Sequence, residues 1–117
     1  MTKTRMSTEW KLWLDDLRSP AAFAPHETDY VWARDIEQAQ YFVRMWGVPT
    51  FMALDHDLGR PAYLTHDEPP EDVMEFLKWL AAKYPDSCPA HNCHSANPQG
   101  VNNVNSFMHS WKRSLSL

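Results

Sequence analysis

Short apolar runs that stop abruptly at polar residues recur along the chain. Residues 10–14 end at two adjacent aspartates, residues 50–54 end at an Asp-His-Asp triplet, and residues 30–33 form a third β-prone run. Short runs of bulky apolar side chains between turn signals are typical of buried strands. The pattern therefore predicts three strands, two of which carry acidic residues at their carboxyl ends.

Helical periodicity occupies the intervals between these runs. Apolar residues recur at spacings of three and four over residues 36–46, 73–80 and 101–111. Asp35, followed three residues later by Gln38, matches the capping arrangement at which helices begin. These spacings predict three amphipathic helices, the last of which starts at an Asn-Pro pair.

The alternation of strands and helices predicts a parallel sheet with covering helices, because parallel neighbours need a long crossover connection. Residues 90–94 are too polar for a typical strand, but their position after the second helix predicts a fourth one. Residues 60–70 are polar and contain prolines, which predicts a loop. We expect one domain over residues 1–117, with residues 1–8 flexible.

Ligands of parallel sheets bind outside the carboxyl ends of the strands. That rule gathers eight residues with functional side chains onto one edge, although they come from separate segments of the chain. They are Asp15, Asp16, Asp55, His56, Asp57, His94, Ser95 and Asn97.

Carboxylates dominate this edge. Like charges so close together are unfavourable unless a hard cation neutralises them or protons are shared. We therefore expect Mg²⁺ or Mn²⁺, with Asp15, Asp16 and Asp57 as the ligands. The alternative is that these acids are solvated loop residues, which is the commoner case for a single acid but not for two clusters.

Two histidines at the same edge suit acid and base catalysis. Histidine is the side chain suited to proton transfer near neutral pH, so of His56 and His94 one can act as general base and the other as general acid on a phosphoryl centre, with Asp55 and Asp57 orienting them. A buried histidine satisfied by hydrogen bonds is the alternative for either one alone.

Three further residues are candidates for binding phosphate. Arg18 offers a bidentate donor, unless it is a surface side chain paired with a neighbouring aspartate. Ser95 offers a hydroxyl donor rather than an activated nucleophile. Asn97 lies at the start of the last helix, where it serves as a cap or helps the helix N-terminus to bind a phosphate oxygen.

Composition narrows the class of partner. The chain has 117 residues, 44% hydrophobic, and its 11 Lys and Arg against 15 Asp and Glu give a net charge of −4. That balance disfavours general binding to duplex nucleic acid. No segment approaches the roughly 20 apolar residues that span a bilayer, so we expect no membrane association and a cytoplasmic location. Two cysteines are too few for a disulfide framework.

Cysteine and histidine also cluster between residues 88 and 94, but their spacing matches no common zinc motif. The six tryptophans raise the question of base stacking. Five of them fall in predicted elements where core packing is the simpler interpretation, and only Trp13 is expected to be free to vary.

Three motifs resemble those of one family. Residues 14–20 (Leu-Asp-Asp-Leu-Arg-Ser-Pro), 54–59 (Leu-Asp-His-Asp-Leu-Gly) and 94–98 (His-Ser-Ala-Asn-Pro) are similar, in this order, to motifs of the cyclic-phosphate-processing receiver-like family. The resemblance covers residues 10–113. That family is related to response-regulator receiver domains and occurs in bacteria and their phages. The resemblance implies a truncated receiver-like (flavodoxin-like) α/β fold, a three-layer sandwich of about four parallel strands with helices on both faces.

The receiver relationship implies roles for individual residues. Asp15 and Asp16 resemble the acidic pair that binds Mg²⁺ in receivers, Asp55 the phosphoacceptor, and Ser95 the small hydroxyl residue after the fourth strand. The chain departs from receivers in three ways. It has no fifth strand with its strand-end lysine, no clear long helix over residues 19–29, and two histidines that ordinary receivers lack.

Together the residues and the resemblance predict a phosphodiesterase that opens a cyclic phosphate. Its substrate would be a cyclic mono- or dinucleotide messenger or a 2′,3′-cyclic phosphate end, and the short chain favours a diffusible nucleotide. In a phage, the expected purpose is to degrade a host immune messenger. Three alternatives stay open: a module that sequesters a nucleotide intact, a receiver phosphorylated at Asp55, and a partner-binding domain. The sequence leaves the oligomeric state undetermined, with a homodimer as one option.

Overall fold

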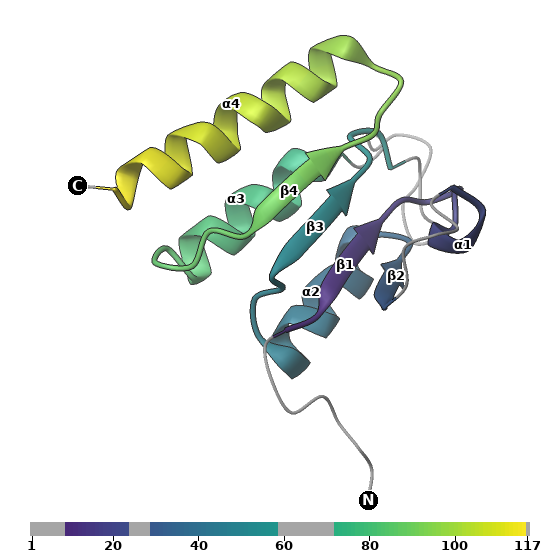
Figure 1. Ribbon diagram of the computed structural model, residues 1–117, viewed down its shortest axis with the longest axis horizontal. Coiled ribbons are helices and arrows are strands. Elements are labelled where there is room, and N and C mark those ends of the chain that lie inside the picture. Colours follow the sequence, from purple (N-terminus) through teal and green to yellow (C-terminus); the bar gives the residue numbers. More distant parts are fainter. Residues whose placement is uncertain (1–8, 24–28, 59–71, 117) are drawn as a thin grey trace, which may run out of the picture.

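The chain folds around one parallel sheet of four strands, in the order β2-β1-β3-β4. The computed structural model describes residues 9–23, 29–58 and 72–116, so the predicted flexible start and the predicted loop over 60–70 lie outside the described residues. The four predicted strands are confirmed. The polar strand β4 lies at an edge of the sheet (Figure 1), and alternate residues along it are exposed to solvent. Their bounds are β1 Lys11–Leu14, β2 Tyr30–Ala33, β3 Phe51–Leu54 and β4 Ala90–Cys93.

The three predicted amphipathic helices are also confirmed, and each starts at a capping side chain. Asp35 accepts a hydrogen bond from the N–H of Gln38, whose side chain accepts one in turn from the N–H of Arg34. None of the described helices is long and apolar enough to cross a membrane. The helices are α1 Pro20–Phe23, α2 Ile36–Trp46, α3 Val73–Lys83 and α4 Pro98–Ser114.

Strand order determines which face each helix covers. The connection from β1 to β2 runs in the opposite direction to those from β2 to β3 and from β3 to β4, so right-handed crossovers place α1 on one face and α2 and α3 on the other. Helix α4 packs on α3 and β4. Leu12, Leu14, Met52 and Leu54 point from the strands into the core beneath these three long helices. The result is the truncated α/β fold that the sequence predicts.

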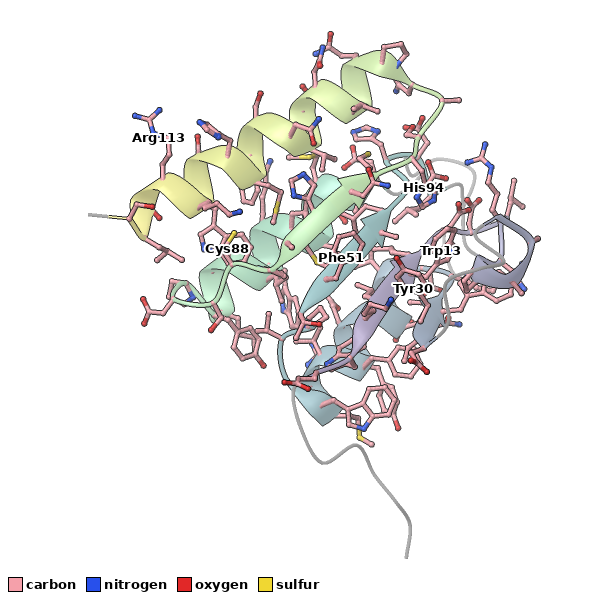
Figure 2. All side chains as sticks on the ribbon, in the orientation of Figure 1. Trp13, Tyr30, Phe51, Cys88, His94 and Arg113 are labelled. Carbon is pink, nitrogen blue, oxygen red and sulfur yellow. The ribbon has the colours of Figure 1, made fainter. Side chains whose placement is uncertain are left out.

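The second face of the sheet has little helical cover among the described residues, since α1 is a single turn (Figure 1). Trp13, Tyr30 and Phe51 lie on this face (Figure 2), and we call it the aromatic face. Trp13, which the sequence predicts to be free to vary, is closely packed: only 3% of it is exposed, although it does not belong to the main core. Its neighbours on the aromatic face and His94 bury it instead.

Candidate functional site at the carboxyl edge

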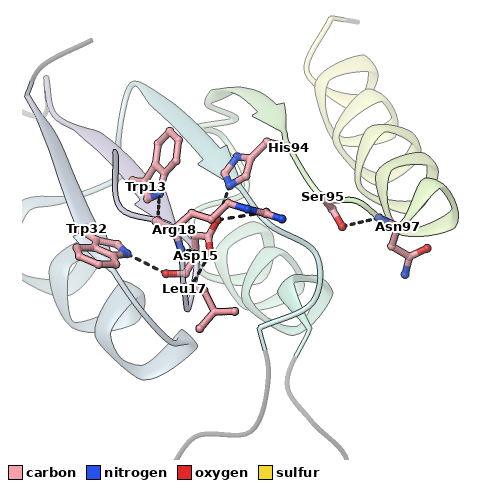
Figure 3. Close-up of polar contacts among 8 residues, drawn as sticks. All are labelled: Trp13, Asp15, Leu17, Arg18, Trp32, His94, Ser95 and Asn97. Atoms are coloured by element: carbon pink, nitrogen blue, oxygen red, sulfur yellow. Dashed lines mark hydrogen bonds and ion pairs between the residues drawn. The ribbon is translucent and has the colours of Figure 1, made fainter. Parts of the chain in front are cut away.

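Asp15 is the most constrained side chain at the carboxyl edge of the sheet. It follows β1, and its carboxylate is buried. Its Oδ1 accepts hydrogen bonds from the N–H groups of Leu17 and Arg18, both at 2.9 Å. Its Oδ2 lies 2.8 Å from Nε2 of His94, which follows β4 (Figure 3). The turn after β1 and the end of β4 are therefore joined through one carboxylate.

Two further carboxylates lie beside Asp15. Oxygen atoms of Asp15, Asp16 and Asp55 all lie within 4.8 Å of one another. Burial raises the pKa of Asp16 and of Asp55, and the negative charge of Asp15 raises both further. Close, partly desolvated carboxylate oxygens are ligands that fit Mg²⁺ or Mn²⁺. The third member of this group is Asp55, whereas the sequence predicts Asp57 in that role.

Asp55→Asn is expected to raise the melting temperature at pH 7 in EDTA by about 4 °C, the shift that about 1 kcal/mol produces in a small domain. The physical reason is that a raised pKa makes the ionised Asp55 less favourable in the folded chain than in the unfolded one. The wild type therefore loses stability as the pH rises from about 4 through the raised pKa, and the asparagine variant loses less.

Thermal unfolding from pH 3 to pH 8 measures this difference. The gap between wild type and variant should close near pH 3 and widen toward neutrality. Added Mg²⁺ should raise the melting temperature of the wild type more than that of the variant. If the melting temperatures of wild type and variant differ by the same amount at every pH, the prediction is wrong.

His56 follows β3 and is paired with the other strand-end acid. Its Nδ1 lies 2.8 Å from Oδ1 of Asp57, and the side-chain amide of Asn97 donates to Oδ2 of Asp57 at 3.3 Å. The Asn97 oxygen accepts from the N–H groups of Gln99 and Gly100, so the predicted cap of α4 is confirmed. One asparagine thus starts α4 and holds the acid that orients His56.

Gly100 lets the His56 ring lie against the first turn of α4. A Cβ atom at position 100 would lie 2.5 Å from Cγ of His56 and 2.7 Å from its Nδ1, closer than real contacts allow. No side chain larger than hydrogen fits there without moving the ring. The sequence shows a glycine near this helix start, but not which side chain it must accommodate.

His94 is enclosed as well as paired. Its ring stacks on Trp13, with centroids 4.6 Å apart and an interplanar angle of 19°, and its Nδ1 is buried. Trp13 in turn donates to the carbonyl oxygen of Arg18, and Trp32 donates to that of Asp15. Two indoles therefore fix the turn that carries Asp15, a role that sequence reasoning missed.

The remaining predicted residues lie at the same edge. Arg18 is 41% exposed, and its Nη1 lies 3.8 Å from Oδ2 of Asp15. Ser95 accepts a hydrogen bond at Oγ from the N–H of Asn97. The cysteine and histidine cluster does not converge within the described residues, since His91 bonds to Asn105 rather than to a cysteine. Burial raises the pKa of both cysteine thiols.

The carboxyl edge therefore combines three clustered carboxylates, two histidine–aspartate pairs and the N-terminus of α4. A carboxylate on one ring nitrogen fixes the tautomer and orientation of a histidine, which prepares it for proton transfer. The positive end of a helix dipole and a cation both favour the negative charge of phosphate oxygens. These groups together suit chemistry at a phosphorus centre.

Comparison with known proteins identifies the family. Searches of curated proteins and of solved structures gave no match. Residues 10–110 match the family described as "Cyclic-phosphate processing Receiver domain", and this span contains all four strands and every residue of the carboxyl edge discussed above. The family resemblance seen in the three motifs is thus confirmed: the chain belongs to the cyclic-phosphate processing receiver domain family.

Proposed function

We propose that this protein is a phosphodiesterase that hydrolyses a cyclic phosphate of a nucleotide. The observation that carries the proposal is the presence of two histidine–aspartate pairs at one sheet edge, His56 with Asp57 and His94 with Asp15. Family membership supports a role in cyclic-phosphate processing. The reaction type and the nucleotide are our own inference.

In the proposed reaction, water attacks phosphorus and one bond from phosphorus to a ring oxygen breaks. The water loses a proton, the departing oxygen gains one, and the product is a phosphate monoester with a free hydroxyl. His56 is the group we assign to proton transfer, through Nε2, because Asp57 engages its Nδ1. Arg18 and the Ser95 hydroxyl are the groups we assign to the phosphate oxygens, and the positive end of the α4 dipole favours their charge, since Asn97 already engages the first N–H groups of that helix.

The carboxylates of Asp15, Asp16 and Asp55 would hold a divalent cation. Such a cation, when bound, supplies positive charge that stabilises the negative charge of the phosphate. Oδ1 and Oδ2 of Asp15 are already engaged by two N–H groups and by His94, so Asp15 has its orientation before any ligand arrives.

His94 has a different environment from His56. Asp15 engages its Nε2, and its Nδ1 is buried, so in this conformation the ring supports the carboxylate cluster rather than facing solvent. That it transfers a proton directly stays a prediction. His94→Gln tests it, because a glutamine amide can donate to Asp15 but cannot transfer a proton.

The test is a panel of 3′,5′-cyclic nucleotides, cyclic dinucleotides and 2′,3′-cyclic nucleotides, each with Mg²⁺, Mn²⁺ or EDTA, read by chromatography and mass. We expect turnover of one class, and a loss of about 10²- to 10⁴-fold in kcat/KM for His56→Ala, the contribution of one general acid or base. His94→Gln should lose much less if His94 only positions Asp15. Equal losses in the two variants would assign proton transfer to both histidines.

Three outcomes would overturn the proposal. Retention of intact nucleotide without product would indicate sequestration, and incorporation of phosphate at Asp55 from acetyl phosphate with Mg²⁺ and no hydrolysis would indicate a receiver. Turnover that survives His56→Ala and His94→Ala unchanged would place the chemistry elsewhere.

A further inference from the structure

A chain of aromatic rings connects the aromatic face to the carboxyl edge. Ring centroids of Phe51 and Tyr30 lie 6.4 Å apart, those of Tyr30 and Trp13 lie 5.2 Å apart, and Trp13 stacks on His94 at 4.6 Å. The rings come from β3, β2 and β1 and lie on one side of the sheet (Figure 2). We call Phe51, Tyr30 and Trp13 the aromatic row. It leads from the first residues of β2 and β3 to His94, the residue that pairs with Asp15.

Cations lie over rings on the same face. Lys11, which lies between Tyr30 and Phe51 in the register of the sheet, has its Nζ 4.5 Å from the Tyr30 ring centre. The Arg34 guanidinium lies 5.0 Å from the ring centre of Trp32. Cations interleaved with aromatic rings are typical of surfaces that bind single-stranded nucleic acid. In a chain with a net charge of −4, this local pattern complements a phosphate backbone rather than reflecting overall charge.

The rings are accessible in part. Tyr30 and Phe51 are partly exposed, and Trp13 is buried between Tyr30 and His94. A base can therefore stack on Tyr30 and Phe51, while Trp13 connects them to the carboxyl edge. Four-stranded sheets that bind RNA use aromatic side chains on an open face to stack two or three bases.

We propose that the aromatic face binds the bases of a single-stranded RNA whose terminal 2′,3′-cyclic phosphate lies at the carboxyl edge. The inference rests on the proposed function and specifies its substrate class, an RNA end rather than a free cyclic mononucleotide. A mononucleotide has a single base and cannot occupy both Tyr30 and Phe51. An oligonucleotide with further bases occupies Tyr30 and Phe51 as well.

The test is a series of oligonucleotides, from one to four residues long, that end in a 2′,3′-cyclic phosphate. We expect kcat/KM to rise about tenfold or more with the first additional base, because one stacked base contributes about that factor in affinity. Tyr30→Leu and Phe51→Leu should abolish the rise with length while leaving hydrolysis of the mononucleotide unchanged. Tyr41→Leu is the matched control, since Tyr41 is 55% exposed on α2, beneath the opposite face of the sheet.

A binding measurement separates this inference from the proposed hydrolysis. Fluorescence anisotropy of a labelled trinucleotide ending in a 3′-phosphate reports binding without turnover, and Lys11→Gln should make that binding less dependent on salt. Binding that is lost in Tyr30→Leu and Phe51→Leu supports the inference even if no substrate is hydrolysed.

Two results would overturn it. Equal kcat/KM for one and three nucleotides, with both leucine variants matching Tyr41→Leu, would leave the hydrolase without an RNA-binding face. A dimer in sedimentation that Tyr30→Leu dissociates, with no oligonucleotide bound, would assign the aromatic face to contacts between two copies of the chain.

Discussion

Asp15→Ala is expected to lower the free energy of unfolding by about 3 kcal/mol, the scale on which removing a buried hydrogen-bond acceptor and leaving its donors unsatisfied destabilises a protein. The substitution leaves the N–H groups of Leu17 and Arg18 without their acceptor, and it leaves His94 without its carboxylate. Urea denaturation at pH 7 in EDTA measures the change.

The neighbouring acid provides the control. Asp16→Ala should change the free energy of unfolding by less than about 1 kcal/mol, or increase it, because burial and the charge of Asp15 already disfavour the ionised Asp16. Asp15→Asn should be intermediate, since it keeps an acceptor for the two N–H groups. Equal effects of Asp15→Ala and Asp16→Ala would show that the hydrogen bonds of Asp15 do not determine stability.

Gly100→Ala is expected to reduce hydrolysis of a cyclic phosphate by at least about 100-fold while the chain stays folded. Alanine favours the helix by up to about 1 kcal/mol relative to glycine, so α4 should persist. Its Cβ atom, however, would lie 2.5 Å from Cγ of His56, so the ring must move. A displacement of about 1 Å at a reacting group costs about that factor in rate.

Ser106→Ala is the matched control for this prediction, since Ser106 lies on the exposed side of the same helix. Circular dichroism and the melting temperature report whether each variant is folded. The value of kcat/KM, measured with the substrate identified in the panel of cyclic nucleotides, reports the activity of the site. If folded Gly100→Ala retains the kcat/KM of Ser106→Ala, the reaction does not depend on the position of His56.

Sequence alone determined the elements of the fold and the edge at which the site lies. Helices over 36–46 and 73–83 follow from local periodicity and from caps such as Asp35, which depend on neighbours a few residues away. Strands that end in acids, once placed in a parallel sheet, bring those acids to the same edge by topology. The three motifs likewise sufficed to indicate the family.

Tertiary structure decided which of these residues meet. Asp15 pairs with His94, which lies 79 residues away, whereas His56 pairs with the adjacent Asp57. Asp55 rather than Asp57 completes the carboxylate group. Asp55 directly follows β3, whereas Asp57 lies two residues further along the turn, where its carboxylate contacts His56 and Asn97. The path of that turn decides which acid joins the cluster, and composition cannot resolve it.

The burial of Trp13 has the same origin. Within its own strand Trp13 is on the side away from the main core, so the strand alone does not show what packs against it. The register of β1 with β2 and the return of the chain at His94 bring Tyr30 and an imidazole ring against it. Local sequence thus determines what each segment forms, and contacts between distant segments determine which side chains share a site, because those contacts exist only after the strands have paired.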